Sequence, residues 1–223
     1  MDEQTQPLMV LVGMGPGMGL SLAHRFAKEG FRIAFMARRL DAVKSFTDRL
    51  RKEGIPTWGY GVDAADPASL QAAFRSIYGS LGEPDVLIYN ASVFREALPS
   101  QLDPADLDLE FRSMVSGFLV SAQAVIPSMK AKGRGSILLS GGGSALSPFA
   151  IGASLCIGKS GQRSLCFSLA QELAPSGIHV ATVTICGMIA PGTPFDPDHI
   201  ADEYWQLHTQ KQEAFETERI YRG

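Results

Sequence analysis

The sequence has few cysteines, no excess of positive charge and no long apolar run. Its 223 residues include three cysteines and no Cys-X-X-Cys pair, so we expect small buried thiols in a reducing compartment rather than disulfides or ligands. The formal net charge of −3 offers no basic face for nucleic acid. No apolar stretch approaches the roughly 20 residues of a membrane-spanning helix. We therefore expect neither a nucleic acid nor a membrane as a partner.

Histidine spacing and the first residues exclude two further classes. The four histidines are far apart and lack metal-ligand spacing, so no metal site is predicted. The start, MDEQTQPLMV, is acidic and polar, unlike a signal peptide, and we expect a cytoplasmic location. The length suits one well-cored domain or at most two small ones. Because no linker, internal repeat or low-complexity segment interrupts the chain, we expect a single domain over residues 1–223.

Residues 8–39 carry the most informative pattern in the sequence. Leu8–Val12 is a continuous apolar run, typical of a strand buried on both faces of a parallel sheet. It leads into a glycine-rich turn whose glycines and intervening methionine are Gly13, Gly15, Gly17, Met18 and Gly19. A helical pattern then runs to Gly30, and Ile33–Met36 is a second apolar run. Strand, glycine turn, helix and strand in this order predict the βαβ unit that binds nucleotides.

The glycines suit this turn for physical reasons. The chain must turn sharply out of the strand, its backbone must approach a pyrophosphate closely, and the helix must pack tightly on the sheet. Free N–H groups and the positive end of the helix dipole then hold the phosphates. The alternative is a glycine-rich turn that binds nothing, but its place between a strand and a helix favours the nucleotide site.

Two arginines at the end of the second strand indicate which nucleotide binds. Proteins that bind NAD place an acidic residue about 20 positions past the glycines, where it binds the ribose 2′-hydroxyl. Here Ala37 is followed by Arg38 and Arg39, and a guanidinium suits a 2′-phosphate that an acid would repel. We therefore expect NADP(H) to be preferred over NAD(H). The alternative is a solvated basic pair that opens the next helix.

Strand and helix patterns alternate through the rest of the chain. Further strands are predicted over Thr57–Val62, Asp85–Tyr89, Ser136–Ser140, Ile178–Ile185 and Glu218–Tyr221. Helices are predicted over Leu40–Lys52, from Asp66-Pro67 to near Gly79, and over Leu107–Lys132, residues 150–173 and Ile200–Gln210, with residues 186–198 irregular. This alternation predicts an α/β fold with one doubly wound parallel sheet. Its ligand crevice should lie at the carboxyl ends of the strands.

On these motifs the chain resembles the short-chain dehydrogenase/reductase family over nearly its whole length. The family's glycine motif, TGxxxGxG, matches Val12–Gly19 with valine in place of threonine. The family's adenine-binding aspartate, its Asn-Asn-Ala-Gly segment, its lysine and its Pro-Gly segment fall in order on Asp63, Asn90 with Ala91, Lys159 and Gly187. The resemblance implies a seven-stranded Rossmann sheet in the order 3-2-1-4-5-6-7. It also implies homodimers or homotetramers formed through the helices around 107–132 and 150–173, and a small-molecule substrate.

The resemblance also implies which residues bind the cofactor. These residues are Gly13, Gly15, Gly17, Met18, Gly19, Arg38, Arg39, Asp63, Asn90, Ala91, Lys159, Gly187 and Ile189. The chain is similar to a divergent subgroup with a GAGPG-type turn, an Ala-Arg-Arg end to the second strand and a Tyr-Trp-Gln-Leu-His helix near the carboxyl terminus. Its counterparts here are Gly13–Gly17, Ala37–Arg39 and Tyr204–His208.

The catalytic positions of the family are largely replaced. Leu155 stands where the family has its tyrosine, Gly142 where it has its serine and Met114 where it has its asparagine, so only Lys159 remains. Leucine cannot donate a proton, and glycine has no side chain to bond a carbonyl. No other tyrosine is expected nearby, because Tyr89 belongs to a strand end and Tyr204 to a helix of surface type.

The remaining candidates for proton delivery are Lys159, water and four serines. Lys159 is expected to contact the nicotinamide ribose, either for binding alone or also as a proton source. The serines are Ser92, Ser140, Ser144 and Ser154, of which Ser144 directly follows the triple glycine. Each serine is also explained as a capping or packing residue. The substrate wall is expected from Ser92–Phe94, Gly142–Pro148 and Met188–Pro194, and its apolar character suits a small apolar carbonyl compound or alcohol.

The sequence is compatible with three hypotheses about function. The first is an NADP(H)-dependent oxidoreductase with non-standard proton delivery. The second is an NADP(H)-binding homologue with impaired catalysis that acts as a sensor or assembly partner. The third is a structural subunit that binds no nucleotide, which the retained glycines and Arg38 disfavour.

Overall fold

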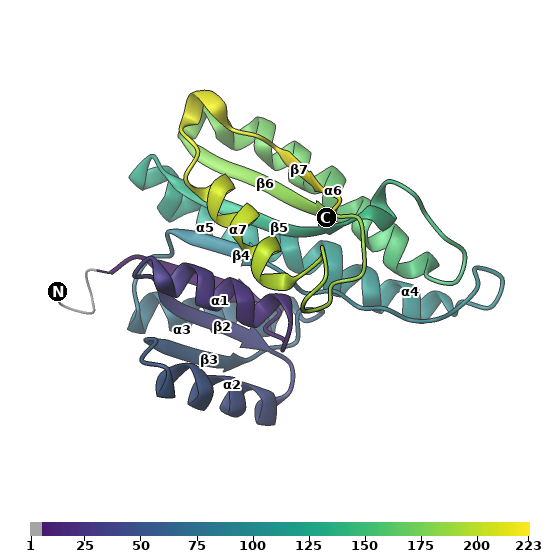
Figure 1. Ribbon diagram of the computed structural model, residues 1–223, viewed down its shortest axis with the longest axis horizontal. Coiled ribbons are helices and arrows are strands. Elements are labelled where there is room, and N and C mark those ends of the chain that lie inside the picture. The colour runs from purple at the N-terminus through teal and green to yellow at the C-terminus, as the bar shows by residue number, and fades with distance from the viewer. Residues whose placement is uncertain (1–5) are drawn as a thin grey trace.

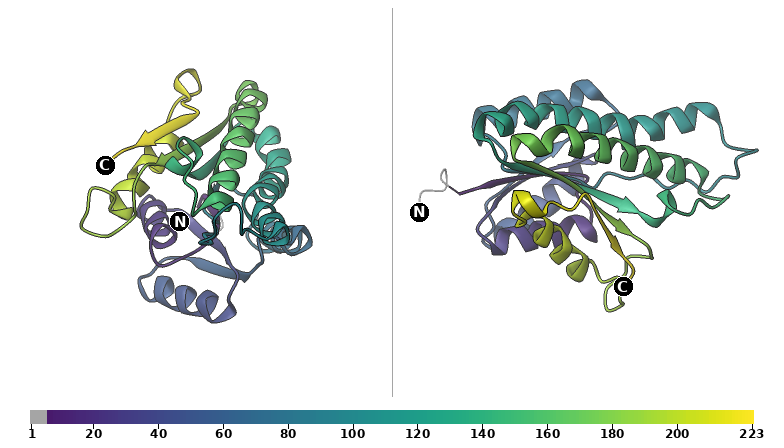
Figure 2. Two further views of the ribbon diagram at one scale, coloured as in Figure 1. Left: turned by 90° about the vertical axis from the view of Figure 1, so that its right-hand side faces the viewer. Right: turned by 90° about the horizontal axis from the view of Figure 1, so that it is seen from above.

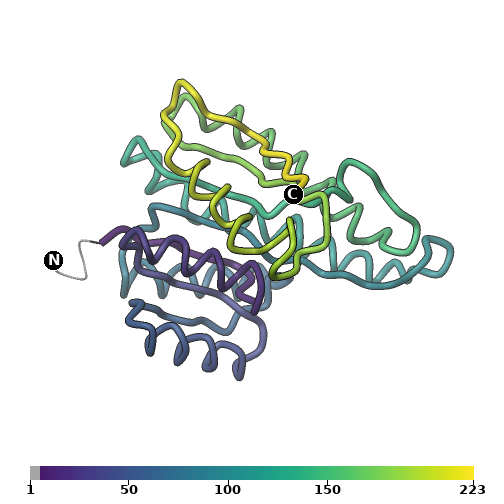
Figure 3. Tube along the Cα trace, viewed as in Figure 1, coloured from purple at the N-terminus to yellow at the C-terminus, as the bar shows by residue number. Residues whose placement is uncertain are grey.

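The computed structural model describes residues 6–223, which form one seven-stranded parallel sheet with helices on both faces (Figure 1). The strand order is β3-β2-β1-β4-β5-β6-β7, so the predicted fold class and order are confirmed. The chain runs from the central β1 to one edge, returns to β4, and continues to the other edge (Figure 3). The strands are β1 (Leu8–Val12), β2 (Arg32–Ala37), β3 (Thr57–Gly61), β4 (Val86–Tyr89), β5 (Gly135–Gly142), β6 (Ile178–Ile185) and β7 (Glu218–Tyr221).

Helices cover the sheet in two layers (Figure 2). Helices α1, α2 and α7 pack on one face, and α3, α5 and α6 pack on the other. Every residue of β1, β2 and β6 is buried, which explains why these strands are rich in apolar residues on both faces. The helices are α1 (Met18–Lys28), α2 (Leu40–Lys52), α3 (Pro67–Ser80), α4 (Pro104–Phe111), α5 (Gly117–Lys132), α6 (Ala153–Leu173) and α7 (Pro197–His208).

Three of these helices begin with the same Asp-Pro pair. The carboxylates of Asp66, Asp103 and Asp196 accept a hydrogen bond from the N–H two residues later at 2.9, 2.8 and 2.9 Å, and proline fills the first helical position. The predicted start of α3 is confirmed. Helix α7 begins at Pro197, three residues before the predicted Ile200, because its aspartate caps it there.

The single helix predicted over Leu107–Lys132 is wrong in detail. A π-helical turn, Arg112–Ser116, separates α4 from α5. Carbonyl groups in this turn accept hydrogen bonds from outside the helix: Ser113 O from the Tyr89 hydroxyl, and Met114 O from Gln162 Nε2 at 2.9 Å. Such side-chain donors relieve the helix of its own i→i−4 bonds and stabilise the wider turn. The predicted apolar stripe is nevertheless buried at Met114, Phe118, Ala122, Val125 and Met129.

Two further boundaries differ around the expected site. Strand β5 continues through Gly142, two residues past the predicted end, because Gly141 and Gly142 pair with Thr184 and Ile185 of β6. Helix α6 begins at Ala153 rather than at residue 150. None of the helices within residues 6–223 is both long and apolar enough to cross a membrane.

Candidate active site

The strands all run toward the side of the molecule where α4 and the segment after β5 project (Figure 1). At this carboxyl end, a cavity of about 310 Å³ brings six predicted cofactor residues together: Gly13, Gly15, Arg38, Asp63, Asn90 and Ala91. A second hollow of about 470 Å³ lies beside it and contains Arg38 and Arg39. The two hollows meet at the glycine turn, where a parallel α/β sheet places its ligand crevice.

The glycines of the turn differ in how much space surrounds them. Gly13 has φ +98°, and a Cβ at this position would lie 2.5 Å from the backbone nitrogen of Ala91. The N–H groups of Gly13 and Met14 both donate to the Met36 carbonyl, at 3.0 and 2.9 Å, which anchors the turn to β2. A Cβ on Gly15 or Gly17 would meet no atom within 4 Å. The turn is thus packed on the protein side and open on the other, where a ligand has direct access to the backbone.

The amino terminus of α1 differs from those of the Asp-capped helices. Its N-cap is Gly17, which makes no side-chain capping bond, and its first turn contains no acidic residue. The first N–H groups of an α-helix have no partner within the helix and carry partial positive charge. At α1 the N–H groups of Leu20 and Ser21 donate to the Gly17 carbonyl at 3.0 and 3.2 Å, which leaves the N–H groups at the start of the helix for a ligand. They are the donor set that a pyrophosphate requires.

Arg38 and Arg39 follow β2 and have different surroundings. The Arg39 guanidinium lies 3.7 Å from the Asp41 carboxylate, and both side chains are about three-quarters exposed. Arg38 is exposed, lines both hollows, and takes part in no ion pair within residues 6–223. Because it is free and shared by both hollows, the Arg38 guanidinium is the better placed of the two for an anionic ligand.

Lys159 lies on α6, next to the end of β5. The side chain is only 7% exposed, and its ammonium donates to the Ser140 carbonyl at 2.6 Å. Burial lowers the pKa of Lys159 to about 8, because removal from water disfavours the charged form. A pKa near neutral pH is the property that a group needs if it is to take up and release protons in a reaction.

The space that the family serine would occupy is bordered by another hydroxyl. A Cβ built on Gly142 would lie 3.5 Å from Ser144 Oγ and 3.6 Å from the Cγ and Cδ atoms of Lys159. The 3₁₀ turn Gly143–Ala145 carries Ser144 back to this point. Among residues 6–223, no hydrogen bond engages the Ser144 hydroxyl, so it is available to a ligand.

The other three candidate serines are less suited to chemistry. Ser140 donates to Asn90 Oδ1 at 2.7 Å, so its proton is committed. Ser154 is 2% exposed and its Oγ is buried without a partner. Ser92 is exposed, and its nearest polar contact is Met114 Sδ at 3.9 Å.

The residues at the asparagine and tyrosine positions are packed rather than exposed to a ligand. Met114 is fully buried, and its thioether occupies the space beside Gly158, where a Cβ would overlap it. Leu155 is half-buried on the first turn of α6. Neither side chain carries a group that exchanges protons. These positions therefore provide packing and an apolar surface.

Six of the predicted cofactor residues line neither hollow: Gly17, Met18, Gly19, Lys159, Gly187 and Ile189. Gly187 and Ile189 belong to the segment that follows β6, which is exposed, with Met188 86% accessible. Phe94, Phe149 and Ile151 are also exposed, at 59%, 44% and 44%. These side chains belong to or adjoin the segments predicted as the substrate wall, whose apolar character they share.

The prediction for Tyr204 is wrong. Tyr204 is fully buried, and its hydroxyl donates to Ser140 Oγ at 2.7 Å, so a tyrosine does reach the strand that carries the site. The stripe Ile200, Ala201, Tyr204 and Leu207 is buried along α7. This i, i+1, i+4, i+7 spacing is visible in the sequence, and it marks a core-facing helix rather than a surface helix.

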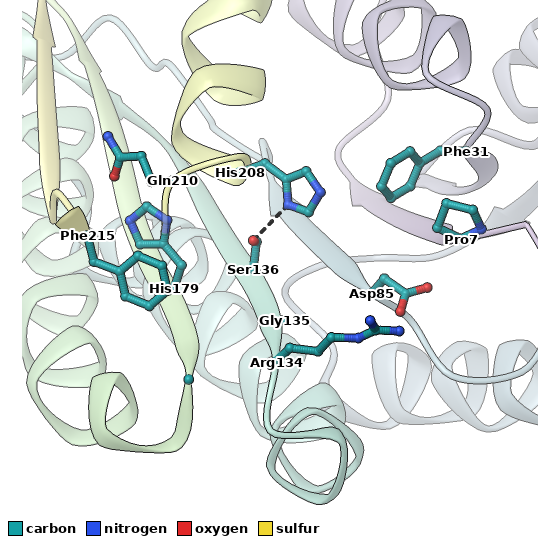
Figure 4. A pocket seen from close by; sticks show the side chains of 11 residues that line it. Pro7, Phe31, Asp85, Arg134, Gly135, Ser136, His179, His208, Gln210 and Phe215 are labelled. Atoms are coloured by element: carbon teal, nitrogen blue, oxygen red, sulfur yellow. Dashed lines mark hydrogen bonds between the residues drawn. The ribbon is translucent and has the colours of Figure 1, made fainter. Parts of the chain in front are cut away.

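A further cavity of about 350 Å³ lies at the opposite, amino end of the strands (Figure 4). His208 and His179 lie along it, Ser136 bonds His208 Nδ1 at 2.8 Å, and Arg134 and Asp85 lie across from them. His179 has carbonyl groups at both ring nitrogens, so its ring is held in place by the chain. None of the predicted site residues lines this cavity. Within the described residues, no cluster of three or more histidine, cysteine or acidic side chains is arranged for a metal ion.

Comparisons with known proteins agree with this geometry. The family model described as short chain dehydrogenase matches residues 7–201. D-threitol dehydrogenase from Mycolicibacterium smegmatis is 27% identical over 78% of this chain and 67% of its own length. Acetoacetyl-CoA reductase from Cupriavidus necator is 27% identical over 81% of this chain and 74% of its own. The crystal structure of a metagenomic short-chain oxidoreductase in complex with NADP is 25% identical, covers 98% of both chains and has a TM-score of 0.87.

Proposed function

This chain belongs to the short-chain dehydrogenase family, and from that membership we propose that it is an NADP(H)-dependent oxidoreductase acting on a carbonyl compound or alcohol. The proposal rests chiefly on Arg38, an exposed guanidinium without an ion-pair partner among the described residues, beside the open glycine turn. A carboxylate at this position would repel a 2′-phosphate, whereas a guanidinium binds it with charge-assisted hydrogen bonds.

The residues around the turn fit a dinucleotide. The uncapped amino terminus of α1 and the open faces of Gly15 and Gly17 suit a pyrophosphate. Asp63 lines the same cavity and would bind the adenine. Lys159, beside the end of β5, would hold the ribose next to the nicotinamide. When bound, the nicotinamide ring supplies or accepts the hydride.

Proton delivery in this proposal uses Lys159 and Ser144 instead of a tyrosine. In reduction, the Ser144 hydroxyl donates a hydrogen bond to the substrate carbonyl oxygen, and the Lys159 ammonium transfers its proton to that oxygen as the alcohol forms. The burial of Lys159 supports this role, because it lowers the pKa to about 8. The apolar residues Phe94, Phe149 and Met188 favour an apolar substrate.

An assembly of two or four chains completes the proposal. Leu109, Phe111 and Ile157 lie on α4 and α6 and are 44%, 40% and 44% exposed. Apolar side chains of this size on neighbouring helices favour contact with a second copy. The location that we propose is the cytoplasm.

The test is a panel of carbonyl compounds and alcohols, followed by NADPH absorbance. We expect slow turnover that falls in the reducing direction as the pH rises through about 8, since Lys159 is protonated below that pH. The opposite reaction should accelerate over the same range. Lys159→Ala should abolish turnover, and Ser144→Ala should lower it about tenfold or more. Ser80→Ala, which removes an exposed hydroxyl on α3, is the matched control. The absence of turnover across the panel would exclude the proposed reaction.

The second candidate is an NADP(H)-binding protein without turnover, a sensor or an assembly partner. One observation favours it. Met114, at the position of the family asparagine, packs against Gly158 and is fully buried in the core. The two candidates differ in one measurement. The second requires tight NADPH binding with no steady consumption of NADPH in the same panel.

A further inference from the structure

Tyr204 begins a chain of hydrogen bonds that ends at the glycine turn. Its hydroxyl donates to Ser140 Oγ at 2.7 Å, and the Ser140 hydroxyl donates to Asn90 Oδ1 at 2.7 Å. The Asn90 Nδ2 group then donates to the Gly13 carbonyl at 2.8 Å. The chain joins α7, near the carboxyl terminus, to β5, to the end of β4 and to the first glycine of the turn.

The direction of these bonds is fixed by what each group can donate. The Gly13 carbonyl accepts only, so Asn90 must turn its NH₂ group toward it and its Oδ1 toward Ser140. The single Ser140 proton must then point to Oδ1, and the serine oxygen needs a donor of its own. Tyr204 is that donor. The hydroxyl of Tyr204 therefore completes the hydrogen bonding of Ser140 while the serine holds Oδ1 of the amide that supports Gly13.

Ser140 also connects this chain to the lysine of the site. While its side chain bonds Tyr204 and Asn90, its main-chain carbonyl accepts the Lys159 ammonium at 2.6 Å. One residue thus holds the supports of both the phosphate turn and the nicotinamide-side lysine. A shift of Ser140 would displace both supports together.

We propose that Tyr204 is a positioning residue of the cofactor site, acting through Ser140 and Asn90 on Gly13 and through the Ser140 backbone on Lys159. This inference rests on the proposed binding of NADP(H). Tyr204 is fully buried and cannot touch a substrate or a nucleotide in the crevice. Its burial raises the pKa of its hydroxyl, which therefore keeps its proton and remains a donor across the physiological range.

The coupling must act in both directions. If the docking of α7 through Tyr204 supports the turn, then a nucleotide bound at the turn stabilises the docking of α7 by the same free energy. NADPH should therefore slow amide hydrogen exchange in α7, although this helix lies on the far side of β5 from Lys159. If Tyr204 had only a structural role, NADPH would leave amide exchange in α7 unchanged.

The test compares Tyr204→Phe, Ser140→Ala and the double variant by NADPH titration. Tyr204→Phe keeps the ring and removes only the hydroxyl. Each single variant should weaken NADPH binding about three- to tenfold, the range for loss of one buried hydrogen bond, and the double variant should bind no more weakly than Ser140→Ala. The matched control is Tyr78→Phe, which removes a phenol bonded to Ser128 Oγ at 2.8 Å between α3 and α5. That control should bind NADPH as the wild type does.

The outcomes separate this inference from the proposed function. A wild type that binds neither NADPH nor NADH overturns both. A wild type that binds NADPH, with Tyr204→Phe unchanged in affinity or with additive effects in the double variant, overturns the positioning role alone. NADPH-dependent protection of α7 that persists in Tyr204→Phe also overturns it. If Tyr204→Phe unfolds, amide exchange of α7 in the wild type still decides the question, because the absence of protection by NADPH overturns the coupling.

Discussion

The glycine turn and the region around Lys159 lie at the same carboxyl end of the strands, yet they differ in how closely they match the motifs of the family. The turn keeps an open backbone, an uncapped helix terminus and the exposed Arg38. The other region has Gly142, Leu155 and Met114 at the positions where the resemblance to the family predicts serine, tyrosine and asparagine, together with Lys159. Binding and proton transfer are thus supported by separate sets of residues, and one set can change while the other persists.

The residues around Lys159 are well packed. Met114 fills the space beside Gly158, and the point above Gly142 is bordered by Ser144 and Lys159. Substitutions that fill space in this way maintain the fold without maintaining the chemistry. A well-packed fold and an open glycine turn therefore do not by themselves establish a reaction.

The largest expected effect comes from restoring the missing groups. The double variant Gly142→Ser, Leu155→Tyr supplies the family hydroxyls, and Gly142 accepts a Cβ because its nearest neighbours would lie at 3.5–3.6 Å. Turnover of NADPH with a carbonyl substrate should rise about 10²–10⁴-fold, the usual contribution of a positioned general acid. The control is Gly142→Ser, Leu155→Phe, which adds the ring without the phenol. Equal rates in the two double variants would contradict the expectation that the missing phenol limits turnover.

The next effect distinguishes the two sides of the glycine turn. Gly13→Ala should destabilise the fold by about 3 kcal/mol, because its φ is +98° and its Cβ would lie 2.5 Å from Ala91 N. Gly15→Ala should change stability by less than about 0.5 kcal/mol, since its Cβ meets no atom within 4 Å. It should nevertheless weaken NADPH binding, because its methyl group enters the space of the phosphates. Urea unfolding and NADPH titration of both variants measure this; unchanged NADPH affinity in Gly15→Ala would place the ligand elsewhere.

A smaller effect concerns the free energy that Lys159 costs. Its pKa is lowered from 10.5 in the unfolded chain to about 8, so between these values the unfolded state binds the proton more tightly than the folded state. Folding stability should therefore rise as the pH goes from 8 to 10.5, with the full cost present below pH 8. Lys159→Met should stabilise the protein by about 2 kcal/mol at pH 7 and by much less at pH 10.

Urea unfolding of Lys159→Met at both pH values checks this expectation. Lys130→Met is the control, since Lys130 is 45% exposed and pairs with Glu172 at the surface. An equal stability of wild type and Lys159→Met at pH 7 would mean that the lysine is not buried in its charged form, and the proposed proton source would lose its physical basis.

Much of this fold follows from the sequence. The strands Leu8–Val12 and Ile178–Ile185 have the predicted bounds because each is buried on both faces and therefore stands out in the sequence. The π-helical turn at Arg112–Ser116 did not follow, since it depends on donors from Tyr89 and Gln162, which are distant in the sequence. Local sequence patterns predict helices, but they do not predict which side chains of other elements will donate hydrogen bonds to a helix.

The site was predictable only in part for a similar reason. Glycine spacing and Arg38 identify the nucleotide end, because those residues act through local backbone geometry and charge. The return of Ser144 toward position 142 depends on a 3₁₀ turn that a run of three glycines does not specify. The placement of Tyr204 depends on the docking of α7, although the apolar stripe that α7 buries is visible in the sequence.

The most direct test of the account is the affinity for the two nucleotides, measured by fluorescence titration with NADPH and NADH. The wild type should prefer NADPH, and Arg38→Asp should lose about 10- to 100-fold in NADPH affinity, as expected for loss of charge-assisted bonds to a phosphate. Arg75→Asp, the same change of charge on the exposed face of α3, should retain wild-type affinity. Equal affinity of the wild type for NADPH and NADH would contradict the account.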